Sequence, residues 1–125
     1  IMEKHKSKNI CNVMMDQTIM SGIGNYLKAE ILYDARVSPL NKVGNIPTKY
    51  LEKLYNSSIK IIKKSYMASG NSLQHYRDID SIRGVFEFKL KVYGRKSDQF
   101  LRKVVRIKTP DGRNTYYVPS IQKEF

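Results

Sequence analysis

The sequence is poor in the residues that build covalent or metal-held frameworks. Its 125 residues include one cysteine, Cys11, and two histidines, His5 and His75. A single cysteine excludes an internal disulfide and a multi-cysteine zinc site. Neither histidine has a cysteine or carboxylate at metal-ligand spacing, so we expect no metal and no other cofactor. Cys11 lies where a helix is expected; we interpret it as a buried small hydrophobe, with a reactive thiol as the alternative.

Long apolar runs and acidic residues are also scarce. No segment approaches the roughly 18 apolar residues that span a bilayer, and residues 1–12 lack the apolar centre of a signal peptide. We therefore expect an intracellular protein without membrane contact. The sequence has 11 Asp+Glu and 23 Lys+Arg, which gives a net charge of +12 at pH 7. This excess is typical of a protein that binds a phosphate-rich partner, and the alternative is a basic surface that serves solubility alone. We find no Ser/His/Asp pattern and no paired carboxylates, and hence no self-contained catalytic site.

Apolar periodicity predicts three helices, over about residues 6–20, 25–35 and 48–68. Thr48 has the position of an N-cap for the third helix, whose outer face carries five lysines. That lysine face is either merely solvated or part of a long-range field that attracts DNA. The fold class is therefore mainly α.

The remaining segments are a linker, a long loop and a hairpin. Pro39, Gly44 and Pro47 mark a loop before the third helix. The polar residues 70–84 predict a long loop, and "VFEFKLKVYGR" after it fits either a strand or a short helix. Alternating β-formers around "PDG" predict a terminal β-hairpin over about 101–119.

The stretch "SGIGNYLKAEIL", residues 21–32, places two glycines before a helix. Gly22 and Gly24 allow a tight turn or a close backbone approach. They also leave amide N–H groups at the positive end of the helix, where a phosphate oxygen can bind, with Asn25 as N-cap and amide donor. A turn between helices and a phosphate site are both open at this point.

The hairpin tip offers a second phosphate-binding candidate. Arg113 follows Asp111-Gly112, so the turn would hold its guanidinium forward, where it can bind a phosphate with two parallel hydrogen bonds. A lone surface arginine often has no such role. Its neighbours on the hairpin favour one here, because they are also basic: Arg102, Lys103, Arg106 and Lys108.

Together these motifs resemble the C-terminal half of the Fpg/Nei DNA glycosylases, the formamidopyrimidine-DNA glycosylase and endonuclease VIII family. "MDQTIMSGIGNYLKAEILYDARVSP" is similar to that family's helix–two-turns–helix segment. "LKVYGR" (90–95) resembles the stretch that leads into its zinc finger, and "DGRNTYYVPSIQ" (111–122) resembles the tip and second strand of the finger. The matches are ordered and spaced as in the family and span about residues 8–122.

Two departures from the family pattern stand out. The positions of the four zinc-binding cysteines carry Phe100, Lys103, Val118 and Ile121, which resembles the zincless finger of some members, in which packing replaces coordination. The family's nucleophile is an N-terminal proline followed by glutamate, in a β-sandwich domain that precedes the helices. This chain starts Ile1-Met2-Glu3, so we expect the catalytic domain to be absent and the chain alone to be inactive.

The resemblance implies a domain architecture. A helix–two-turns–helix domain covers residues 1–85, with a lesion-side loop at about 70–84, and a zincless β-hairpin finger covers 86–125. The parent protein would be a monomeric base-excision-repair DNA glycosylase/AP lyase that removes oxidised bases and cleaves by β- or β,δ-elimination. It would act in the nucleus, the cytoplasm or a viral factory.

The resemblance also implies a partner and its contacts. The partner is double-stranded DNA with a damaged base or abasic site, and the second partner is the catalytic domain of the same parent protein. Asn25, Gly24, Arg113 and Tyr93 would bind the phosphates around an everted nucleotide. Two alternatives remain: a non-enzymatic nucleic-acid-binding module, of ribosomal helix–two-turns–helix or helix-hairpin-helix type, and a scaffold protein derived from the glycosylase fold.

Overall fold

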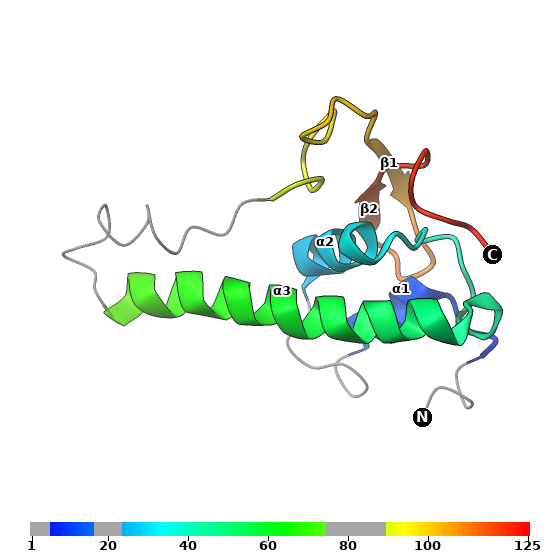
Figure 1. Ribbon diagram of the computed structural model, residues 1–125, viewed down its shortest axis with the longest axis horizontal. Coiled ribbons are helices and arrows are strands. Elements are labelled where there is room, and N and C mark those ends of the chain that lie inside the picture. Colours follow the sequence, from blue (N-terminus) through cyan, green and yellow to red (C-terminus); the bar gives the residue numbers. More distant parts are fainter. Residues whose placement is uncertain (1–5, 17–23, 75–89) are drawn as a thin grey trace.

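Three α-helices, a short 3-10 helix (Val43–Asn45) and one β-hairpin make up the part of the chain that the computed structural model describes, residues 6–16, 24–74 and 90–125. The long helix α3 (Thr48–Gln74) extends along one side, and α2 (Asn25–Ala35) lies between it and the hairpin (Figure 1). This confirms the predicted class, mainly α with a small hairpin. Gly22 and the expected domain boundary near 85 lie outside the described residues. No helix among those described is long and apolar enough to cross a membrane.

Helix α1 (Ile10–Met15) is shorter than the predicted helix over 6–20. It begins at Ile10 because the Asn9 side chain caps it, accepting a hydrogen bond from the Cys11 amide at 2.8 Å. The residues before it run beside the linker instead, where the Val43 and Gly44 amides donate to the carbonyls of residues 8 and 6. At the other end the helix stops at Met15, because the backbone of Asp16 is extended. Cys11 is buried, as predicted, and burial raises the pKa of its thiol to about 11.

Helix α2 has the predicted bounds. Eight of its 11 residues are buried, including two charged ones, Lys28 and Glu30. Its C-terminal end is a left-handed cap at Arg36, with φ 64°. A helix with most of its residues buried is a central element, and α2 contacts both α3 and the hairpin.

Helix α3 extends six residues past the predicted end at 68, so residues 70–74 are helical and not the start of a loop. Thr48 is the first helical residue and not the N-cap, because the Pro47 carbonyl accepts the first helical bond, from the Leu51 amide. The apolar stripe is only partly buried. Tyr55, Ile59 and Tyr66 are exposed, while the side that faces α2 buries the following residues: Tyr50, Leu54, Ser57, Ser58, Ile61 and Ser65.

The hairpin pairs β1 (Val105–Lys108) with β2 (Asn114–Tyr117) in antiparallel register. Both strands lie inside the predicted span of 101–119. Beyond β2 the chain returns to the helices: the Lys123 amide donates to the Arg36 carbonyl and the Ser38 amide to the Lys123 carbonyl, at 2.8 and 2.9 Å. The Phe125 ring packs on Tyr50 of α3 with centroids 4.8 Å apart. This return segment, residues 122–125, ties the hairpin end of the chain to the helices.

Two hydrophobic clusters share α2. The first joins α1, α2 and α3 and includes Ile10, Ile31 and Ile61. The second joins α2 to the hairpin through Ala29, Tyr33 and Val118. Because opposite sides of one helix belong to two clusters, α2 fixes the position of the hairpin relative to the helices.

Candidate nucleic-acid interface

The hairpin tip presents Arg113 to solvent. Thr109 and Arg113 close the turn through a 2.9 Å bond from the Thr109 amide to the Arg113 carbonyl. Between them Pro110, Asp111 and Gly112 form a three-residue loop, and Gly112 has the positive φ, +81°, that such a loop requires. Arg113 is exposed, and its side chain has no hydrogen bond or ion pair within the described ranges. The guanidinium is therefore available to a ligand.

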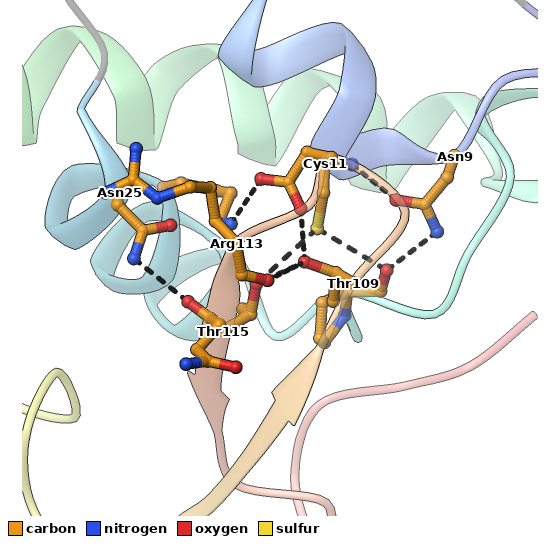
Figure 2. Close-up of polar contacts among 10 residues, drawn as sticks. Asn9, Cys11, Asn25, Thr109, Arg113 and Thr115 are labelled. Carbon is orange, nitrogen blue, oxygen red and sulfur yellow. Dashed lines mark hydrogen bonds and ion pairs between the residues drawn. The ribbon is translucent and has the colours of Figure 1, made fainter.

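The first turn of α2 lies next to this tip. Asn25 is the first helical residue, and Gly24, not Asn25, is the N-cap. The Asn25 Nδ2 donates to the Asn114 carbonyl at 2.9 Å, directly beside Arg113 in sequence. In Figure 2 the Arg113 side chain extends toward the end of α2 where Asn25 lies. The structure thus brings together the two predicted phosphate ligands, which are 88 positions apart in the printed sequence.

Gly24 does not need to be glycine for the conformation that it adopts. Its φ of −96° and ψ of 177° are open to any residue. A Cβ at this position would make only ordinary contacts, 3.8 Å from the Tyr26 ring, among the described residues. Gly24 therefore does not use the conformational freedom that a glycine allows. What glycine does provide is an uncovered backbone at the N-terminal end of α2.

Tyr93 is held by a residue that the sequence analysis missed. The Glu30 carboxylate accepts hydrogen bonds from three successive amides, those of Lys91, Val92 and Tyr93, at 2.7, 2.9 and 2.9 Å. Glu30 is 3% exposed. Its anchoring fixes the turn that follows, which includes Gly94 at φ +73°. No local sequence signal identifies Glu30, since its partners lie some sixty positions further along.

Tyr93 belongs to an aromatic trio with Tyr26 and Tyr116. The Tyr93 ring makes edge-to-face contacts with Tyr26, at 6.2 Å between centroids, and with Tyr116, at 5.1 Å. The three rings come from the turn, from α2 and from β2. All three are partly exposed, so the trio forms an aromatic wall next to Asn25.

The basic residues of the hairpin differ in their availability. Arg106 and Lys108 are exposed on β1. Arg102 is paired: its Nε donates to Asp98 Oδ2 at 2.7 Å. Asp98 also accepts from the Phe100 and Arg102 amides and from the Tyr33 hydroxyl. Although burial alone raises the pKa of Asp98, these donors outweigh it and hold the pKa at about 2. Arg102 therefore braces the base of the hairpin and is not a free cation.

The four positions that align with zinc ligands have different environments. Val118 is fully buried in the second cluster, and Ile121 packs against that cluster. Phe100, however, is 64% exposed and contacts Arg102, and Lys103 is exposed. Of these four residues, Val118 and Ile121 are therefore packed, and the expectation of packing was wrong for Phe100. The hydrogen bonds of Asp98 organise the loop that includes Phe100.

Comparison with known proteins identifies the class to which this fold and site belong. Residues 2–77 match the family model described as the formamidopyrimidine-DNA glycosylase H2TH domain. The chain belongs to this family. Among curated relatives, the formamidopyrimidine-DNA glycosylase of Carboxydothermus hydrogenoformans is 34% identical over 122 residues, 96% of this chain and 46% of the relative. That of Prochlorococcus marinus strain MIT 9215 is 33% identical over 121 residues, 94% of this chain and 41% of the relative.

Solved structures show the same architecture. A viral DNA glycosylase superposes with a TM-score of 0.79 at 30% identity, covering 98% of this chain and 42% of that one. The LlFpg protein, solved with THF-DNA and an inhibitor, gives a TM-score of 0.78 at 25% identity, covering 98% and 45%. The chain therefore spans less than half the length of the relatives that it matches.

Proposed function

We propose that this chain is the DNA-binding half of a base-excision-repair DNA glycosylase/AP lyase that removes oxidised bases from duplex DNA. The observation that carries the proposal is the hydrogen bond from Asn25 to Asn114, because it sets the start of α2 beside the exposed Arg113. Two phosphate-binding groups from distant parts of the sequence then face one ligand. The family membership supports a DNA substrate in preference to the alternative of a ribosomal-type or helix-hairpin-helix module.

Phosphate binding follows from the groups at this site. An eleven-residue helix presents its positive end at Gly24, where the missing side chain leaves the backbone open to a phosphate oxygen. Arg113 supplies a cation with paired donors on the other side. Tyr93, in the adjoining wall, would add a hydroxyl contact. Binding the backbone on both sides of a nucleotide offsets the few kcal/mol that everting its base costs.

The chemistry itself would come from the catalytic domain of the same parent protein. This chain aligns with 41–46% of the length of these two curated relatives, and its sequence contains no proline-glutamate pair for Schiff-base formation. We therefore expect the chain alone to bind DNA as a monomer without cutting it, with the zincless finger as one arm of the site. The parent would act where DNA is repaired, in the nucleus, the cytoplasm or a viral factory.

The test is fluorescence anisotropy with a labelled duplex that contains one tetrahydrofuran abasic analogue. Arg113→Ala is expected to weaken binding about tenfold, as for the loss of a charge-assisted contact, and to reduce the slope of log affinity against log salt by about one. Asn25→Ala should also weaken binding. Lys49→Ala is the control, since that exposed lysine lies at the start of α3, away from Asn25. Salt-independent binding, or no loss for either variant, would refute the proposal.

The inactivity of the chain is tested separately by borohydride trapping on abasic DNA. No covalent adduct is expected. An adduct would show that the chain holds its own nucleophile.

A further inference from the structure

A fully buried lysine lies beneath the hairpin tip. Lys28, on the first turn of α2 after Asn25, is 0% exposed, and its ammonium contacts Asp111 Oδ2 at 2.6 Å. The Asp111 side chain is 4% exposed. Lysine is rarely buried so completely, and a buried ion pair contributes little net stability, because desolvation offsets the attraction. A feature with so little net gain in stability calls for another role.

The ion pair is part of a polar network that connects the helices to the hairpin. The Thr109 hydroxyl donates to Asp111 Oδ1 and lies 2.8 Å from the Thr115 hydroxyl. Thr115 in turn lies 4.0 Å from the Cys11 sulfur of α1. Figure 2 shows the hydroxyls of Thr109 and Thr115 beside the Cys11 side chain. The network spans α1, α2 and both ends of the tip, so the tip has a defined position relative to the helices.

The two ties from α2 bracket Arg113. Asp111, two residues before it, is held by Lys28, and Asn114, the next residue, is held by Asn25. Both holding groups are on the first turn of α2. Arg113 is thus the exposed residue between two fixed points, and its Cα cannot move away from Asn25 while both ties persist.

We propose that Lys28 is a positioning residue for DNA binding: its buried ion pair with Asp111 sets Arg113 at the correct separation from Asn25 for one phosphate backbone. Lys28 does not touch DNA, because Asp111 and the surrounding side chains enclose its ammonium. Its cation acts through the geometry of the tip. This inference rests on the proposed function, since it concerns the same phosphate site.

A double-mutant cycle between Lys28 and Arg113 tests the inference on the 125-residue chain with the tetrahydrofuran duplex. Lys28→Met removes the ammonium and retains most of the length of the side chain. It is expected to weaken binding about fivefold or more in the wild-type background. In the Arg113→Ala background the same change should have almost no further effect, because a misplaced tip matters only while Arg113 is present. Near-UV circular dichroism confirms that each variant is folded at the temperature of the assay.

Lys60→Met is the matched control. Lys60 also pairs with an aspartate, Asp34, at 2.9 Å, but its side chain is 51% exposed. Its removal should leave affinity within about twofold in both backgrounds. Should Lys28→Met fail to fold, Asp111→Asn takes its place in the double-mutant cycle with Arg113→Ala. This variant breaks the ion pair from the other side and retains an acceptor for Thr109.

The outcomes separate the two proposals. If Arg113→Ala itself leaves binding unchanged, the proposed function fails. If Arg113→Ala weakens binding but the Lys28 change has no effect, or has the same effect in both backgrounds, the positioning role is overturned and the proposed function stands. A loss for Lys28→Met that disappears in the Arg113→Ala background supports both.

Discussion

Glu30→Gln is the perturbation whose effect can be worked most directly from the structure. The carboxylate accepts three backbone hydrogen bonds, one on Oε1 from Lys91 and two on Oε2 from Val92 and Tyr93. A glutamine has one carbonyl oxygen, so at best it keeps the two bonds from Val92 and Tyr93. Its NH2 group then faces the Lys91 amide, donor against donor. The turn therefore loses one charge-assisted bond and gains an unsatisfied N–H.

This loss amounts to roughly 2 kcal/mol, within the range for an unsatisfied donor and a hydrogen bond to a charged group. A shift of that size makes the locally open state of the turn about thirtyfold more populated. Amide hydrogen exchange, followed by NMR on the ¹⁵N-labelled chain, should therefore accelerate by about that factor at Lys91, Val92 and Tyr93. The strands of the hairpin should change far less.

Glu52→Gln is the control, because Glu52 is exposed on α3 and has no hydrogen bond or ion pair among the described residues. Exchange at residues 91–93 that stays within about threefold of wild type in Glu30→Gln would refute the anchoring argument. Equal acceleration in Glu52→Gln would refute it as well. If Tyr93 contacts a phosphate as proposed, the Glu30 variant should also bind the abasic duplex more weakly.

Two further predictions concern stability. The pKa of Asp98 lies at about 2, below its ordinary 3.8, so its contribution to the free energy of unfolding is full above about pH 4 and is lost as pH falls toward 2. In urea unfolding, Asp98→Asn should therefore lose less stability than the wild type over that pH interval. Equal pH dependence in the two proteins would contradict this. Ile61→Ala, at a buried position of α3, should cost about 2–4 kcal/mol of unfolding free energy. Ile59→Ala, two positions away and 50% exposed, should cost less than about 1 kcal/mol, and similar losses for the two would contradict the placement of the core.

The elements with local signals were predicted well. The bounds of α2 could be predicted because Gly24 precedes it and apolar residues repeat at helical spacing. The tip could be predicted because "PDG" needs a residue with positive φ, which Gly112 supplies. Arg113 followed from that turn. In each case the determining residues lie within a few positions of the feature.

What could not be predicted depends on partners far along the chain. Nothing near Lys28 or Glu30 in the sequence signals a buried role. Their partners are 83 positions away, at Asp111, and about 60 positions away, at the Tyr93 turn. The start of α1 was missed because residues 6–8 pair with the linker. The end of α3 was missed because polar residues and Gly70 weaken a helix by about 1 kcal/mol each or less, which is too little to end one.

The return segment, residues 122–125, has a consequence for the order of folding. Its bonds to Arg36, Ser38 and Asn41 connect residues more than eighty positions apart, and the side-chain Nε2 of Gln122 donates to the Val37 carbonyl. A nascent chain that has completed α1, α2 and α3 still has these groups at the end of α2 unpaired, because their partners are synthesised only after the hairpin. Closing so large a loop is entropically slow. We expect a translation intermediate with formed helices and an open α2 end, which becomes native only after Lys123 has left the ribosome.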